Sequence, residues 1–155
     1  MKESDIETVD LSQEIEAIKK EFGSHYYKDE RATKKAAALW GETSNECGVF
    51  EKCSFETIVK TNHCKGEIQY ANTSKGYWLI GVSAQTALFG FGYAPSVWDR
   101  KAYKSYYDAR LAGVFFLHDF FNTAVNGGSS QAQKTEIMQA LAHLNGEKTP
   151  QLGLF

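Results

Sequence analysis

The sequence predicts an α+β fold in which helices at both ends of the chain enclose a small antiparallel sheet. Apolar residues recur at helical spacing before Trp40 and again in the last third of the chain. The middle of the chain instead alternates between apolar and polar positions, as half-buried strands do, and a run of turn-forming residues, 72–76, interrupts it. Strands gathered between runs of helices are typical of α+β domains.

Two helices are predicted in the N-terminal part of the chain. The first covers residues 11–22, where apolar side chains return every three or four positions and Gly23 can form the C-cap. The second runs from about Asp29 to Trp40, with an alanine-rich interior and Gly41 as its stop.

The central segment predicts a hairpin or meander. Residues 49–59 alternate in polarity, and residues 66–71 and 77–83 flank the turn. A further apolar, glycine-rich segment, 87–94, is broken by Pro95.

A long helix is expected from about Val97 to Val125, with Ser96 and Asp99 forming its N-terminal cap. Its second half, 111–121, is apolar almost all round and is therefore expected to lie at the centre of the fold. A last helix is predicted over 131–144, with four residues facing inward: Ile137, Met138, Leu141 and Leu144.

These elements divide the chain into an acidic arm (1–10), a single α+β domain (11–146) and a C-terminal tail (147–155). Residues 1–22 carry seven acidic and three basic residues, although the net charge of the whole chain is only −2. No signal-type apolar stretch, no apolar run long enough to span a membrane and an odd count of three cysteines together predict a cytoplasmic protein with reduced thiols.

The tail carries the most specific sequence signal. Pro150 cannot continue a helix, and the residues after it are Gln151-Leu152-Gly153-Leu154-Phe155, with three large apolar side chains where chain ends are usually polar. This string resembles the peptide by which bacterial polymerases and repair proteins bind the replicative sliding clamp, and it is especially similar to the C-terminus of a bacterial B-family repair polymerase.

The resemblance implies that Gln151 forms hydrogen bonds at the rim of a clamp pocket and that Leu152, Leu154 and Phe155 fill its apolar floor. It covers only the tail and implies nothing about the fold. The alternative is that the tail folds back over an apolar groove of its own domain.

A second signal is the interleaving of aromatic and basic residues after Pro95. Aromatic platforms beside cations are used by grooves that bind single-stranded nucleic acids. The candidate DNA-contacting residues are Trp98, Arg100, Lys101, Tyr103, Lys104 and Tyr107. The alternative is an aromatic core with charges on its outer rim.

The sequence predicts no cofactor and no metal. Cys47, Cys53, His63 and Cys64 are residue types that bind zinc, but neither Cys47/Cys53 nor His63/Cys64 has the Cys-x-x-Cys spacing, and whether they hold a metal stays open. No thiol lies in a context that marks it as an activated nucleophile.

We therefore predict an accessory or modulator of DNA replication or repair, of bacterial, phage or plasmid origin, recruited to the sliding clamp and with single-stranded DNA as a further candidate partner. One alternative is a small enzyme or ligand-binding domain with a pocket lined by Tyr93, Trp98 and His118. The other is an inhibitor or immunity-type module that binds proteins through an exposed aromatic patch.

Overall fold

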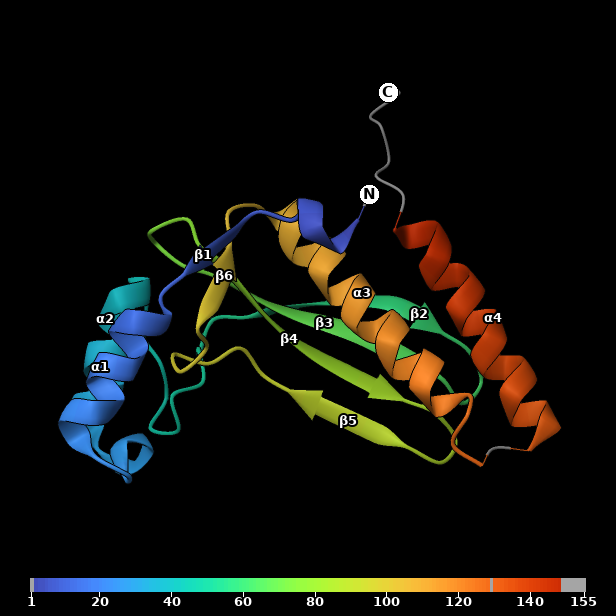
Figure 1. Cartoon of the computed structure of the whole chain (residues 1–155), viewed down its shortest axis with the longest axis horizontal. Coiled ribbons are helices and arrows are strands. Elements are labelled where there is room, and N and C mark those ends of the chain that lie inside the picture. The colour runs from blue at the N-terminus through green and yellow to red at the C-terminus, as the bar shows by residue number, and fades with distance from the viewer. Residues whose placement is uncertain (1, 129, 149–155) are drawn as a thin grey trace.

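The computed structural model describes residues 2–128 and 130–148, and it confirms the predicted α+β class (Figure 1). Six antiparallel strands form one sheet, with two helices before the main strands and two long helices after them. The helices are α1 (Ser12–Phe22), α2 (Glu30–Trp40), α3 (Tyr106–Ala124) and α4 (Gln131–Glu147). The strands are β1 (Thr8–Asp10), β2 (Ser54–Lys60), β3 (Lys65–Asn72), β4 (Trp78–Gln85), β5 (Gly90–Tyr93) and β6 (Lys101–Tyr103).

Strand β4 organises the sheet. It pairs along its whole length with β3, which in turn pairs with β2. On its other side, the first residue of β4 pairs with β6 and its last four residues pair with β5. Strand β1, which lies within the predicted acidic arm, pairs with β6. The strand order is therefore β1-β6-β4-β3-β2, with β5 beside the second half of β4.

Two hydrophobic cores lie on opposite faces of this sheet, because successive strand residues point in opposite directions. Helices α3 and α4 cover one face, and Val82 and Ala84 of β4 point into that core. Leu79 of β4 points into a second core, formed with α1 and α2, which sit at the β1–β6 end of the molecule (Figure 1). The remaining part of this second face is not covered by α1 and α2.

The predicted long helix is wrong in its first part. Residues 97–100 form an irregular turn, β6 follows, and α3 begins only after Ser105, whose Oγ accepts a hydrogen bond from the Asp108 N–H at 3.1 Å. The Ser96–Asp99 pair does form a cap-like contact, with the Ser96 N–H donating to Asp99 Oδ2 at 3.0 Å. That contact closes a turn, because pairing of the following residues with the distant β1 overrides the local helical signal.

Other predictions need smaller corrections. Met138, expected inside, is 61% exposed, whereas Ile137 and Leu144 are fully buried. Helix α4 continues past the expected end to Glu147. Strand β2 starts at Ser54 rather than at Val49, which forms only an isolated bridge with Ser96.

Helix α3 is also less enclosed than its composition suggests. Gly113, Val114, Leu117 and Phe121 are buried, but Phe116 is 37% exposed. Within the described residues, none of the helices combines the length and the apolar character needed to cross a bilayer.

Candidate partner-binding surface

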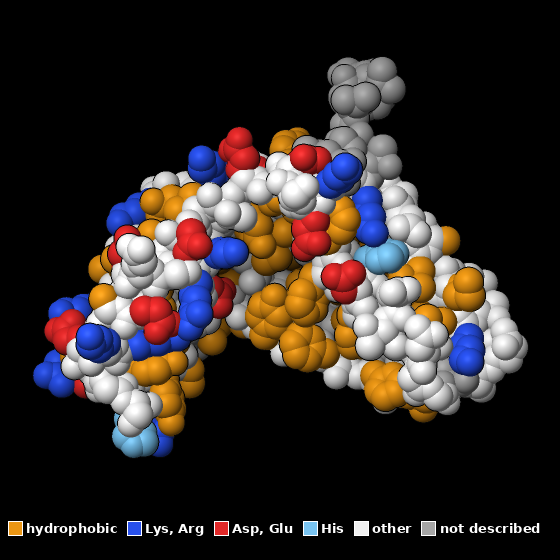
Figure 2. Space-filling model, viewed as in Figure 1, with side chains coloured by type: hydrophobic (Ala, Val, Ile, Leu, Met, Phe, Trp, Pro, Cys, Tyr) orange, Lys and Arg blue, Asp and Glu red, His pale blue; other side chains and the backbone are white. Residues whose placement is uncertain are grey.

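An exposed group of aromatic rings lies where the edge strand β5 meets α3. We call it the aromatic surface; it consists of Phe89, Phe91 and Tyr93 from the β4–β5 hairpin and Phe116 from α3. Between 37% and 50% of each side chain is exposed. The rings of Phe91 and Phe116 stack with centroids 5.9 Å apart, and Tyr93 meets Phe116 edge to face at 5.8 Å. Figure 2 shows hydrophobic side chains gathered in the hollow that α3 borders.

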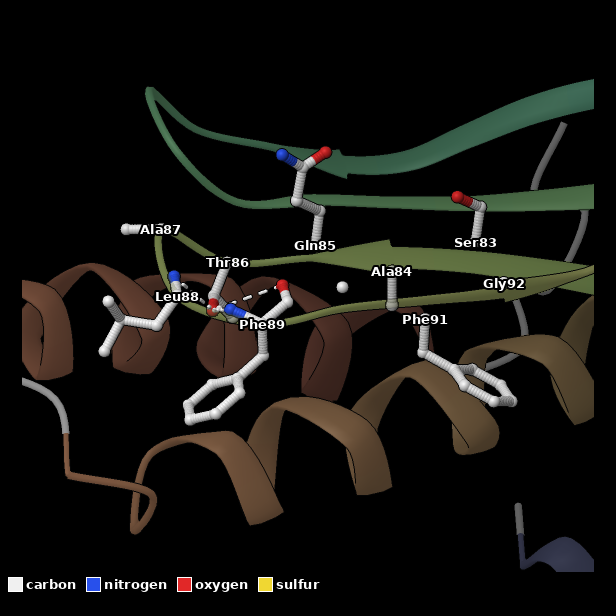
Figure 3. Close-up of a pocket in the computed structure, with 10 residues that line it drawn as sticks. Ser83, Ala84, Gln85, Thr86, Ala87, Leu88, Phe89, Phe91 and Gly92 are labelled. Carbon is white, nitrogen blue, oxygen red and sulfur yellow. Dashed lines mark hydrogen bonds between the residues drawn. The ribbon is translucent and has the colours of Figure 1, made fainter.

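The register of β5 explains why its aromatic residues share one face. Ala84 pairs with Phe91 and Val82 pairs with Tyr93, so both rings lie on the side of the sheet that α3 covers. Phe89 and Phe91 point toward the α3 side in Figure 3, whereas Ser83 and Gln85 point to the opposite face. The Gly-Phe-Gly-Tyr sequence of β5 thus places rings on one face and no side chains on the other.

Residues 83–92 of the hairpin line an open hollow of about 510 Å³. Gly90 and Gly92 pair with Gln85 and Ser83, so the floor of the hollow is largely backbone. A Cβ atom added at Gly90 would have only Ala84 O within reach, at 3.9 Å, and one at Gly92 would lie 3.4 Å from Val82 O. The glycines are therefore not required by crowding within the chain.

This part of the chain carries no charge. No Asp, Glu, Lys, Arg or His occurs between Lys75 and Asp99, a stretch that covers β4, the hairpin loop and β5. Partial burial raises the pKa of Tyr93, within the aromatic surface, to about 12, and burial raises that of the nearby Asp99 to about 6. An uncharged, exposed aromatic surface is typical of sites that bind other proteins.

The six predicted DNA-contacting residues are not arranged as a free basic groove. The Trp98 ring packs edge to face against Tyr26, at 4.7 Å, beside the second core. Tyr103 is half-buried in β6, and Tyr107, at 80% exposed, is the only one of the three aromatic candidates that stands free in solvent.

Each of the three basic candidates faces an acid from the N-terminal part of the chain. Arg100 forms an ion pair with Glu16, and Lys104 Nζ lies 3.9 Å from Glu7 Oε2. Lys101 pairs in the sheet with Asp10, and its charge helps to lower the pKa of Asp10, after the hydrogen bonds from Ser12. Acidic residues of the arm and of α1 therefore offset the positive charge that would attract a DNA backbone.

The predicted clamp-binding residues, Gln151, Leu152, Leu154 and Phe155, lie outside the described residues. The helix that leads to them is fixed at its end. Arg110 Nη2 donates to Glu147 Oε2 at 2.9 Å, and Lys148 Nζ lies 4.9 Å from the centre of the Phe115 ring.

The pocket proposed for an enzyme or ligand-binding domain does not form as expected. Tyr93 contacts Phe116 in the aromatic surface, whereas Trp98 contacts Tyr26 on the other core. His118 lies on α3, and burial, followed by the nearby charge of Lys148, lowers its pKa. These three side chains do not line one cavity.

The cysteine and histidine candidates are also separated. Cys47 is exposed, Cys53 is half-buried and Cys64 is buried. In residues 2–128 and 130–148, no three His, Cys, Asp or Glu side chains come together as metal ligands. Burial raises the pKa of the Cys64 thiol, which disfavours the nucleophilic thiolate.

His63 and Cys64 belong instead to a loop that Glu136 of α4 holds in place. Glu136 accepts hydrogen bonds from the Thr61 hydroxyl and from the backbone N–H groups of His63, at 2.6 Å, and Cys64, at 3.1 Å. The hydrogen bond from Thr61, followed by that from the His63 N–H, lowers the pKa of Glu136 to about 2. This carboxylate has a structural role in joining the β2–β3 loop to α4.

A second polar cluster, which the sequence did not reveal, joins β2, β3, α3 and α4. Glu56 Oε1 accepts hydrogen bonds from the hydroxyls of Tyr70 and Tyr106, both at 2.7 Å. Arg110 Nε donates to Glu56 Oε2 at 3.0 Å and links it to Glu147. Burial opposes the ionisation of Glu56, but these hydrogen bonds outweigh it and lower its pKa. Because all its members are paired, the cluster has the character of a structural network.

Comparison of the chain with protein-family models, curated proteins and solved structures returned no match. The function must therefore be argued from the tail sequence and from the geometry of the described residues.

Proposed function

We propose that this chain is an accessory or modulator of bacterial DNA replication or repair that is recruited to the sliding clamp through Gln151–Phe155. The observation that carries the proposal is the Gln-Leu-x-Leu-Phe string itself. By occupying a pocket that other clamp-binding proteins share, the chain would also exclude them from the clamp.

The energetics of such a peptide fit a weak, reversible tether. Burying three large apolar side chains gains roughly 1.5–3 kcal/mol each, and ordering five flexible residues costs roughly 1–2 kcal/mol each. The hydrogen bonds of Gln151 and the backbone then decide the balance, and we expect a dissociation constant of about micromolar.

The end of α4 supports this proposal, because it gives the peptide a fixed point of attachment. Leu144 is fully buried, and Glu147 is tied to Arg110. The peptide begins only a few residues beyond this anchored turn. A short connection limits the entropy that is lost when the folded domain is held beside a partner.

A protein-binding role is favoured over catalysis by what the described residues offer. The two polar clusters around Glu56 and Glu136 are fully used in joining elements of the fold. The most prominent exposed feature is the aromatic surface, which also supports the second candidate, an inhibitor or immunity-type protein-binding module.

The proposal is tested with point variants of the tail. We expect Leu154→Ala with Phe155→Ala to weaken binding to a purified bacterial sliding clamp by about 100-fold, since both side chains would leave the pocket floor. The matched control is Phe55→Ala, which removes a 63% exposed ring from β2, far from the tail in sequence, and should bind as the unchanged chain does. A free peptide of residues 147–155 should compete; equal binding by all forms would refute the proposal.

A further inference from the structure

We infer that the chain forms a homodimer in which the β5 strands of two copies pair antiparallel and join the two sheets. This pairing is independent of clamp binding. Strand β5 has a free edge, because within residues 2–128 and 130–148 it pairs with β4 alone. An edge strand with unpaired backbone groups is a template for another strand.

Most of the usual protection of such an edge is missing here. Natural proteins keep exposed edge strands very short or shield them with charged residues, proline, bulges or covering elements, and of these devices β5 has only its length of four residues. All four residues of β5 are exposed, none is charged, and the nearest proline, Pro95, comes after the strand. The exposed aromatic surface lies directly beside this edge, as expected for a surface that is covered in the assembled state.

The hydrogen-bond pattern identifies the residues that face outward. In the hairpin, the Thr86 N–H donates to Phe89 O at 2.7 Å, so the backbone groups of Phe89 point toward β4. Backbone groups alternate along an antiparallel strand. Phe91 and Tyr93 therefore bond to β4, and Gly90 and Gly92 present their N–H and C=O groups at the free edge.

The strand is complementary to itself. When Phe91 lies opposite Phe91 of the second copy, Gly90 of each copy lies opposite Gly92 of the other. The outward N–H of each glycine then donates a hydrogen bond to the C=O of the opposite glycine in the second copy. Phe89 lies opposite Tyr93, so the aromatic surfaces of the two copies become continuous on the α3 side.

A second copy of the chain is favoured over an unrelated protein as the partner of β5, because the edge carries no charges that would select a different partner. Between Lys75 and Asp99 there is nothing to repel an identical surface. When two β5 strands run antiparallel, each glycine lies opposite a glycine and each aromatic residue lies opposite an aromatic residue. Symmetric pairing of one patch with itself is also the commonest form of oligomer.

The first experiment is sedimentation velocity of the full chain from about 1 to 100 µM. We expect a species with the mass of two chains, populated increasingly with concentration. A monomer throughout this range would overturn the inference. It would do so even if β5 pairs with a strand of an unrelated protein.

Two double variants then test the register. Gly90→Lys with Gly92→Lys sets lysine opposite lysine at both pairs, and we expect the dimer dissociation constant to rise about tenfold or more. Gly90→Lys with Gly92→Glu sets lysine opposite glutamate, and dimerisation should be retained. The space around both Cβ positions allows the folded chain to accept either pair. Loss of the dimer in both variants, or in neither, would overturn the proposed pairing.

Cross-linking gives a measurement that does not depend on introduced charge. Phe91→Cys lies opposite itself in a non-hydrogen-bonded pair, where Cα atoms are about 4.5 Å apart and a disulfide can form. The variant is made with Cys47→Ser, because Cys47 is exposed. We expect a covalent dimer under mild oxidation, and none from Phe55→Cys, an exposed site on β2. Equal yields from both sites would contradict the inference.

Discussion

Phe91 of β5 and Phe116 of α3 stack with their planes inclined by 24°, although 50% and 37% of these side chains remain exposed. The contact ties a four-residue edge strand to the longest helix of the fold. It holds the rings in one arrangement on the surface, which lowers the entropy that a partner would lose in binding them.

We expect Phe116→Ala to lower the free energy of unfolding by roughly 1–2 kcal/mol, because it removes the stacked pair and the contacts of the shielded part of the Phe116 ring. Met138→Ala is the matched control: Met138 is 61% exposed on α4, and its loss should change stability little. Urea denaturation of both variants measures the difference. Equal effects would mean that the stacking contributes nothing.

The second prediction concerns the contribution of the Glu56 cluster to stability. Glu56→Ala leaves Arg110 Nε and two tyrosine hydroxyls without their acceptor, and we expect the free energy of unfolding to fall by roughly 2–4 kcal/mol. Tyr106→Phe, which removes one donor, should cost about 1 kcal/mol. Chemical denaturation of the two single variants and the double variant tests the network: in the absence of Glu56, the Tyr106 change should have almost no effect, and fully additive losses would contradict it.

The sequence predicted the fold class and most elements, because their signals are local. Gly23 and Gly41 do follow the first two helices, and both adopt positive φ. The predicted helix from Val97 failed because residues 101–103 form a strand with residues near the N-terminus, and no local pattern records that pairing. Met138 was misplaced because α4 buries only a narrow stripe of residues.

The candidate sites were less predictable for the same reason. The exposed aromatic surface depends on the register of β5 against β4, which brings Phe91 beside Phe116 of α3. The neutralisation of Arg100 and Lys104 depends on where the acidic arm and α1 lie in space. The uncharged stretch between Lys75 and Asp99 was the one sequence signal that could have indicated the β5 surface.

Acid should weaken the anchor of the β2–β3 loop. The pKa of Glu136 is about 2 in the folded chain, against an ordinary value of 4.5, so its ionised form stabilises the fold above about pH 4.5. That contribution is lost as the pH falls toward 2. We expect Glu136→Gln to reduce stability at neutral pH and to flatten its dependence on pH in this window.

The measurement is the free energy of unfolding from denaturant titrations at several pH values between about 6 and 2.5. Glu46→Gln, at an exposed position in the loop after α2, provides the control and should follow the unchanged chain. An unaltered acid profile for Glu136→Gln would show that its hydrogen bonds to the loop do not contribute.

Single-stranded DNA should bind weakly to the chain. Glu7 and Glu16 offset Lys104 and Arg100, so we expect a dissociation constant above about 10 µM for oligothymidine at physiological salt. Glu7→Gln with Glu16→Gln should tighten binding several-fold and steepen its salt dependence. Glu30→Gln, which frees Lys34 on α2, is the control. Tight binding by the unchanged chain in fluorescence anisotropy would contradict the neutralising role of Glu7 and Glu16.

The most direct test of the proposed function is the affinity of the full chain for a purified bacterial sliding clamp, compared with that of a chain ending at Pro150. We predict binding with a dissociation constant of about micromolar for the full chain and no binding for the shortened one at tens of micromolar. Equal thermal stability of the two forms would confirm that the shortened domain is intact. Failure of the full chain to bind, or undiminished binding by the shortened chain, would contradict recruitment through Gln151–Phe155.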